Sequence, residues 1–217
     1  MLSSVTVPLS ASALAPPSGP KRRMTAQGRR EQILDVTHAI VDAEGFHAAT
    51  LNRISEEAGI NRSLIYQKFG DLAGLFVELI DREAGRAGVQ FAAAIVGLRA
   101  ADDDRSLVLA FDGVLAAIDA NPATWRLFLL PPQGAPPELY VRLAQSQDVV
   151  LEFFLSELRR KEPDLYEPEL TARILHAAGR ELLQLHLREP GAATTERLRA
   201  YVRRLAADLV SRVPRPS

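Results

Sequence analysis

One stretch decides the fold of this chain, Thr50 to Gly70, which reads TLNRISEEAGINRSLIYQKFG. Its first part predicts a short helix, because Thr50 is a favoured N-cap residue and apolar residues follow it at helical spacing. Gly59 stands where a left-handed residue commonly ends a helix. Asn61 is a second favoured N-cap, so another short helix begins almost at once. The pattern is that of a helix-turn-helix.

The second helix of this pair has one apolar side and one polar side. Ile65 and Phe69 are four residues apart and point inward, which leaves arginine, glutamine and hydroxyl side chains on the other face. A helix fits into a major groove about 12 Å wide, where arginine reads guanine and glutamine reads adenine. Hydroxyl groups, cations and helix N-termini bind phosphates. We therefore expect the DNA-contacting residues to be Arg29, Thr50, Asn61, Arg62, Ser63, Tyr66, Gln67 and Lys68. Two short helices of an ordinary helical domain remain the alternative.

The flanking sequence carries a family resemblance. A basic amphipathic helix, then Gly45-Phe46, then the stretch above, then a leucine-rich helix follow one another in an order that resembles the tetracycline-repressor-like (TetR/AcrR) family of bacterial transcription regulators. The resemblance covers roughly residues 26–79. Leu64 and Leu72 depart from it, since the family commonly has a small or hydroxylated residue and a phosphate-contacting lysine there. The resemblance implies a homodimeric regulator, most often a repressor, that leaves a palindromic operator when a small apolar effector binds.

Composition narrows the class of protein. The 217 residues carry a net charge of −1, with a slight excess of basic residues up to Gly70 and of acidic residues beyond it. The chain has no cysteine, which excludes disulfides and thiolate metal sites and suits a reducing cytoplasm. No apolar run approaches the roughly 20 residues of a membrane-spanning helix, so we expect no membrane partner.

The domain organisation follows from the helical patterns. We expect an all-α fold of about nine helices, with a disordered leader over residues 1–24 and a three-helix DNA-binding domain over 25–70. A larger ligand-binding and dimerisation domain covers 71–213, and 214–217 form a disordered tail. A signal peptide is the competing interpretation of the leader, and Met24 is a second possible start. Gly85 and Gly88 are expected to bend or end the fourth helix, and Asp102 to Asp104 to cap the next.

Large apolar side chains recur between Phe91 and His176, where the resemblance places a ligand cavity. Trp125 is the strongest candidate for its wall, because indole combines an apolar body with one hydrogen-bond donor. Aromatic residues at helical spacing are more often plain core, and that alternative stays open. The candidate pocket residues are Phe91, Phe111, Trp125, Phe128, Tyr140, Phe153, Phe154 and His176.

The last two helices are expected to build the dimer. An apolar stripe follows the final helix, and a patch of small residues flanked by leucines follows the helix before it; pairing both across a two-fold axis gives a four-helix interface. Packing within one subunit is the alternative. The candidate interface residues are Ala178, Gly179, Leu182, Leu198, Tyr201, Val202, Leu205 and Leu209.

Catalysis finds little support in the pattern. His38 and His47 belong to the DNA-binding domain, while His176 and His186 are ten residues apart and so lie roughly 80° out of register on one helix. No phosphate-binding loop or nucleophile elbow occurs. We expect no catalytic residues, no metal and no cofactor. The alternatives are a helical ligand-binding or structural dimer without an operator, and least of all an enzyme assembled from distant residues.

Overall fold

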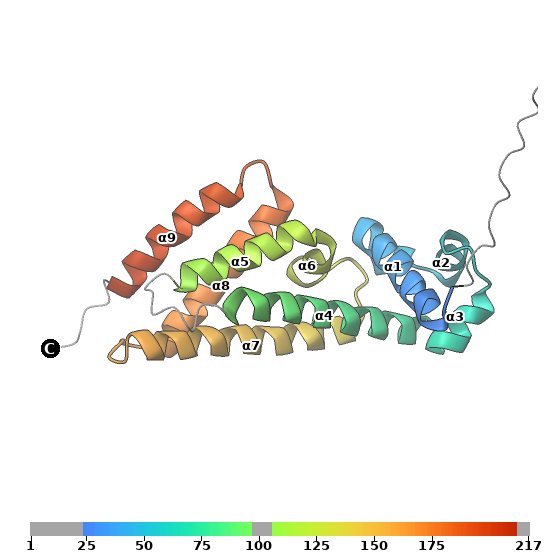
Figure 1. Ribbon diagram of the computed structural model, residues 1–217, viewed down its shortest axis with the longest axis horizontal. Helices are drawn as coiled ribbons and strands as arrows, with labels where there is room; N and C mark the ends of the chain where they lie inside the picture. Colours follow the sequence, from blue (N-terminus) through green and yellow to red (C-terminus); the bar gives the residue numbers. More distant parts are fainter. Residues whose placement is uncertain (1–23, 97–105, 212–217) are drawn as a thin grey trace, which may run out of the picture.

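The computed structural model describes residues 24–96 and 106–211, with side chains described up to residue 205. Within these ranges the regular structure is helical and no strand occurs, which confirms the expected all-α class (Figure 1). The leader before Met24, the tail 214–217 and the aspartate cap at 102–104 lie outside the described residues. The described helices are α1 (Ala26–Glu44), the 3-10 helix η1 (Phe46–Ala48), α2 (Leu51–Glu57), α3 (Arg62–Phe69), α4 (Leu72–Val96), α5 (Ser106–Ala120), α6 (Pro122–Leu129), α7 (Pro137–Lys161), α8 (Pro168–Arg188) and α9 (Thr195–Ser211).

The helix-turn-helix is built from the local signals that the sequence contains. Thr50 Oγ1 accepts a hydrogen bond from the backbone N–H of Arg53 at 3.3 Å, and Asn61 Oδ1 accepts one from Ser63 at 2.9 Å. Both side chains therefore satisfy N–H groups that a helix start leaves free. Between the two helices, Gly59 has a φ of +62°, a conformation that glycine adopts without steric cost. Both predicted caps and the predicted turn are confirmed.

The core beneath the helix-turn-helix extends past it into the rest of the chain. Ile33, Ile54, Ile65 and Leu75, from α1, α2, α3 and α4, are all 0% exposed and belong to one cluster. Leu127 of α6 and Leu139 of α7 lie in the same cluster. The backbone N–H of Phe46 also donates to the Gln133 carbonyl at 3.0 Å. Helices α1, α2 and α3 thus share a core with α4, α6 and α7, which follow the expected boundary after residue 70.

Helix α4 runs unbroken from Leu72 to Val96, so the expectation that Gly85 and Gly88 bend or end it is wrong. Each glycine costs about 1 kcal/mol relative to alanine in a helix, which is a weak preference beside tertiary packing. Both glycines are exposed, whereas Leu79 and Ile80, on the preceding turns, are fully buried. The helix is held by its neighbours α5 and α7, and these contacts outweigh the local preference.

The remaining helices form layers along α4. Helix α7 runs beside α4 for much of its length, and α5 covers another side of it (Figure 1). Helix α8 packs on α7 and α6, while α9 lies against α5 at the far end from α1 to α3. No single described helix meets the length and hydropathy needed to cross a membrane; only α5 and α6 together do, as a pair bent by 113°.

Candidate DNA-binding surface and ligand cavity

Helix α3 has one buried side and one side open to solvent. Ile65 is 0% exposed and Phe69 packs against the same core, which fixes the rotation of the helix. The open side carries Arg62, Ser63, Tyr66 and Gln67, all exposed. The packing therefore presents a face of planar and hydroxyl-bearing side chains, which is the chemistry that reads base edges and phosphates in a major groove.

Arg62 is held in place by a neighbour that the sequence pattern did not single out. Its Nη1 donates to Asn52 Oδ1, so the exposed guanidinium lies across the turn from α3 to α2. Asn52 is itself exposed, and its amide can make further hydrogen bonds. The contact orients Arg62 without burying it, because both partners are open to solvent.

Lys68 connects α3 to the first helix. Its Nζ donates to the Ala26 carbonyl at 3.1 Å, and its own carbonyl accepts from Arg30 Nη1 at 2.8 Å. Arg30 also pairs with Glu78 of α4 and lies 4.7 Å above the ring of Phe69. These contacts tie the end of α3 to α1 and α4. Lys68 thus has a structural role in addition to the phosphate contact expected of it.

The other expected DNA contacts lie at helix starts. Arg29, half-buried in the first turn of α1, donates from Nη1 to Gln32 Oε1 at 2.6 Å. Thr50 accepts a bond as the cap of α2 and keeps its hydroxyl proton for a further partner. Asn61 caps α3 and is exposed. That all these residues contact DNA stays a prediction.

An ion-paired arginine joins α2 to α1. Arg53 donates from Nη1 to Glu44 Oε2 at 2.6 Å and from Nε to Glu57 Oε1 at 2.8 Å. Its hydrogen bond to Glu44 lowers the pKa of that carboxyl group, and the bonds to both carboxylates raise the pKa of Arg53. With its cation already paired, Arg53 is less available to phosphate than Arg62.

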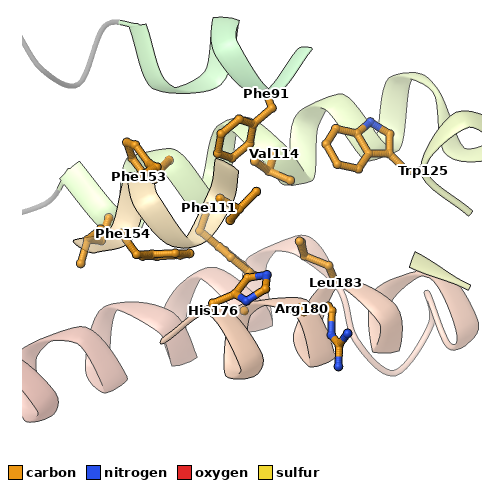
Figure 2. A pocket seen from close by; sticks show the side chains of 13 residues that line it. Phe91, Phe111, Val114, Trp125, Phe153, Phe154, His176, Arg180 and Leu183 are labelled. Carbon is orange, nitrogen blue, oxygen red and sulfur yellow. The ribbon is translucent and has the colours of Figure 1, made fainter. Parts of the chain in front are cut away.

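A cavity of about 120 Å³ lies among α4, α5, α6, α7 and α8 (Figure 2). Phe91 and Phe153 meet edge to face on its wall, with ring centroids 5.8 Å apart and planes at 86°. Phe153 also contacts Phe154 at a centroid distance of 5.8 Å. Its lining residues are Phe91, Leu107, Ala110, Phe111, Val114, Trp125, Val150, Phe153, Phe154, His176, Gly179, Arg180 and Leu183.

Six of the eight expected pocket residues lie on this wall, and two do not. Phe128, three residues after Trp125, packs on the N-terminal core instead. Tyr140 is 55% exposed, because it follows the fully buried Leu139 and points away from it. The aliphatic part of the wall and Arg180 were not predicted, because the expected pocket residues were chosen for their aromatic rings and no periodic pattern marks Arg180. Ligand binding by the cavity stays a prediction.

The cavity wall has few polar groups, and they differ in whether they already have a hydrogen-bond partner. The indole N–H of Trp125 donates to Gln90 Oε1 at 2.8 Å, so this donor is already satisfied. His176 makes no hydrogen bond within the described part of the chain, and its ring lies 6.4 Å from that of Phe154. Burial lowers the pKa of His176, and the nearby charge of Arg180 lowers it further, so the imidazole is neutral at pH 7.

Three consecutive residues of α6 connect the cavity with α4 and α1. Thr124 donates to Glu83 Oε2 at 2.6 Å, and Glu83 of α4 is 0% exposed. Trp125 lines the cavity. Arg126 forms two hydrogen bonds with the carboxylate of Asp42 in α1, at 2.7 and 2.6 Å. The pair raises the pKa of Arg126, mainly through these hydrogen bonds.

The buried carboxylate of Glu83 also lies in a chain of charges that reaches α1. Arg82 donates from Nε to Glu83 Oε1 at 2.9 Å and from Nη1 to Asp35 at 2.8 Å and Glu31 at 3.1 Å. Arg86 gives Glu83 a further bond at 2.9 Å. A buried carboxylate needs such partners, because leaving it unpaired in the interior is costly. A continuous set of polar contacts therefore runs from Thr124, the residue before Trp125, through Glu83 and Arg82 to α1.

The expected dimer residues divide into three groups. Leu198 is 4% exposed and packs with Leu115 and Ala193 inside the subunit, and Gly179 lines the cavity, so neither is free to meet a partner. Ala178, Leu182, Val202 and Leu205 are half-buried and Tyr201 is 54% exposed. The side chain of Leu209 lies outside the described residues. The prediction that Leu198 lies in the dimer interface is wrong, because a periodic apolar stripe does not show which neighbouring helix its side chains contact.

Helix α8 exposes an apolar stripe that begins two turns before the small-residue patch expected on this helix. Leu170 and Ile174 are 56% and 55% exposed, and Ala177 is exposed one turn further on. Their i, i+4, i+7 spacing places them on one face.

Within the described ranges, no group of three or more His, Asp or Glu residues is arranged so that it could hold a metal ion.

Comparison with known proteins shows which proteins this chain resembles in sequence and in fold. The profile of "Bacterial regulatory proteins, tetR family" matches residues 33–79. An HTH-type transcriptional regulator of Staphylococcus aureus (strain USA300) is 33% identical over 61 residues, 28% of this chain and 33% of the relative, so the chain matches about a third of that protein's length. A TetR-like transcriptional regulator from Rhodococcus sp. RHA1 has a TM-score of 0.68 at 21% identity, covering 88% of this chain and 97% of its own. NalD, the secondary repressor of the MexAB-OprM multidrug efflux pump in Pseudomonas aeruginosa, has a TM-score of 0.64 at 18% identity, covering 83% and 96%. At these identities the two structures establish the fold alone.

Proposed function

We propose that this chain, which belongs to the tetR family of bacterial regulatory proteins, represses transcription by binding a palindromic operator as a homodimer and is released by a small molecule held in the cavity. The observation that carries the proposal is the outward face of α3. Its polar side chains are exposed while Ile65 and Phe69 lock the opposite face into the core. A helix fixed in this way can enter a major groove without rearrangement.

The exposed face of α3 supports sequence-specific binding. Arg62 and Tyr66 are one turn apart and both open to solvent. Because Asn52 holds the Arg62 guanidinium at the surface, the arginine reaches a guanine edge with a small change of rotamer. In a dimer the two α3 helices must lie roughly 34–36 Å apart to enter successive major grooves. A DNA-binding regulator of this kind acts in the bacterial cytoplasm.

The apolar stripe of α8 supports dimerisation. Leu170, Ile174 and Ala177 leave a solvent-facing apolar surface, and Tyr201 of α9 adds an exposed aromatic ring. An isologous interface needs a surface that complements its own copy across a two-fold axis, and helices with such stripes pack in this way. The interface we propose therefore combines this stripe with the exposed part of α9, without Leu198 or Gly179.

Release by a ligand is supported by the contacts of α6. A molecule that displaces Trp125 also displaces its neighbours Thr124 and Arg126, which bind Glu83 of α4 and Asp42 of α1. A change in these contacts alters how α1 rests on the larger domain, and α1 carries the helix-turn-helix. A coupling of about 1–3 kcal/mol between ligand and operator is sufficient for regulation.

The operator proposal is tested with DNA taken from upstream of the protein's own gene. Full-length protein is titrated into fluorescently labelled fragments, and affinity is measured by anisotropy at matched salt. Arg62→Ala is expected to weaken binding roughly ten- to a hundredfold, as loss of one bidentate base contact does. Arg159→Ala is the matched control, because Arg159 is exposed in the last turn of α7, and the end of α7 that leads into α8 lies opposite α3 (Figure 1).

Two results would contradict the proposal. Equal operator affinity for Arg62→Ala and wild type would show that α3 does not read the DNA. A folded wild-type dimer that prefers no fragment over unrelated DNA would favour the alternative of a helical ligand-binding protein without an operator. Circular dichroism of each variant checks that the helices are intact.

A further inference from the structure

We infer that the cavity takes an uncharged aromatic molecule of one ring with a single hydroxyl group, a simple phenol, whose hydroxyl bonds to His176. This inference names the ligand class and rests on the ligand-binding part of the proposed function. It follows from the size of the cavity, the chemistry of its wall and the imidazole of His176, which has no hydrogen-bond partner within the described residues.

The size of the cavity limits the ligand to about one ring. Its volume is about 120 Å³. An engineered protein cavity of about 150 Å³ holds one benzene molecule. One benzene ring with a small substituent is therefore near the upper limit of what the space between the helices holds, and a fused polycyclic compound or a long acyl chain needs the wall to move apart.

The wall favours a flat ring over an aliphatic body of the same size. Phe91 and Phe153 already meet edge to face, and Phe154 continues the group toward α8 (Figure 2). Aromatic rings gain from edge-to-face and offset contacts beyond the area they bury. A further ring placed beside them meets the same geometry.

His176 supplies the hydrogen bond. Figure 2 shows its imidazole extending from α8 toward the aromatic side chains, and its nitrogens have no hydrogen-bond partner within the described residues. A neutral imidazole has one donor and one acceptor nitrogen. A hydroxyl group can use either, because it both donates and accepts. A ligand without a polar group would displace water from the half-buried imidazole and offer it no hydrogen bond in return.

An anionic ligand fits this wall less well. Figure 2 shows the guanidinium of Arg180 directed away from the aromatic side chains, and Arg180 is exposed. A carboxylate placed against Phe91 and Phe153 would lose its hydration without gaining a buried cation. The neutral state of His176 agrees with this, since a site built for an anion favours the charged imidazolium.

The test compares three single-ring probes, each a toluene ring with a different para substituent, on the full-length protein without DNA. These are p-cresol, toluene and 4-methylbenzoate, titrated by calorimetry at pH 7.5, with the emission of Trp125 as a second reading because it is the only tryptophan and lies on the wall. We expect p-cresol to bind about tenfold more tightly than toluene, as one net hydrogen bond gives, and 4-methylbenzoate to bind more weakly than either.

Variants of His176 decide whether the preference arises there. His176→Phe is expected to abolish the tenfold preference for p-cresol while toluene still binds, and His176→Gln to retain part of it. His47→Phe, an exposed histidine of η1 outside the cavity wall, is the control and should bind like wild type. Equal binding of p-cresol and toluene to wild type, tightest binding of 4-methylbenzoate, or an unchanged preference in His176→Phe would each overturn the inference.

Failure of this inference differs from failure of the proposed function. Operator affinity is measured without any ligand, so a protein that binds its operator but shows no phenol preference refutes only the ligand class. Both His176 variants leave α3 untouched and should bind the operator like wild type. A protein that binds p-cresol as expected but no operator refutes the regulator and leaves the cavity assignment standing.

Discussion

Replacing Thr124 by valine is expected to destabilise the protein although the two side chains have nearly the same shape. Thr124 Oγ1 donates to Glu83 Oε2 at 2.6 Å, while Arg82 and Arg86 both donate to the other oxygen, Oε1. Valine therefore removes the hydrogen bond of Oε2 on a carboxylate that is 0% exposed. A hydrogen bond to a charged group contributes about 1.5–3 kcal/mol, and a cost of about 2 kcal/mol follows.

The measurement is thermal unfolding followed by circular dichroism. In a protein of this size each kcal/mol shifts the melting temperature by about 2–4 °C, so Thr124→Val should melt about 4–8 °C below wild type. Thr195→Val is the matched control, because Thr195 donates at 3.2 Å to Asp119, whose side chain is 50% exposed. Water replaces that bond, and the control should shift by less than about 2 °C. Equal shifts in the two variants would refute the reasoning about Glu83.

The same substitution tests the coupling through α6. Operator affinity without ligand should stay near that of wild type, because α1 keeps its bonds from Arg126 to Asp42 and from Arg82 to Asp35. The ligand's effect on operator affinity should shrink, since the link from the cavity wall to Glu83 is removed. Anisotropy with and without saturating p-cresol measures both quantities. A ligand effect as large as in wild type would mean that the signal takes another route.

Two further predictions concern the last helices. Ile174→Glu should convert the dimer to a folded monomer, as measured by light scattering, because it places a charge in the exposed α8 stripe. Val149→Glu is the control and should leave the dimer intact, because Val149 is 62% exposed on α7. An unchanged dimer mass for Ile174→Glu would reject the proposed interface. Burial lowers the pKa of His186, but hydrogen bonds to the Ala193 carbonyl and the Asp119 carboxylate outweigh it and leave the pKa raised. The charged imidazole therefore stabilises the fold below pH 6.5, and this contribution is lost as pH rises through the raised value. The stability difference between wild type and His186→Gln should shrink across that window, and a difference that grows with pH would contradict the assignment.

The helix-turn-helix could be predicted because its signals are local. Thr50 and Asn61 cap helices by bonding to backbone N–H groups two or three residues away, so the sequence alone holds both partners. The rotation of α3 was equally readable, since Ile65 and Phe69 sit one turn apart on the only apolar face.

The cavity and the interdomain contacts could not be read in the same way. Phe128 and Tyr140 were expected in the pocket because they are aromatic, but helix rotation turns them toward the N-terminal core and toward solvent. The bond between Arg126 and Asp42 joins residues 84 positions apart, and no spacing along the chain announces it. Periodicity tells which side of a helix is apolar and not which neighbour covers it.

Helix α4 gives the proposed regulation its mechanical basis. Its first turns hold Leu75 in the core of the DNA-binding helices, and its far part carries Phe91 on the cavity wall. The helix is continuous between them, and the 16 residues from Leu75 to Phe91 span about 24 Å at 1.5 Å per residue. A tilt of about 5° at the cavity therefore moves the other end by about 2 Å. Because Leu127 and Leu139 pack in that same core, the DNA-binding helices cannot shift independently of α6 and α7, and a small displacement at the cavity must change their position.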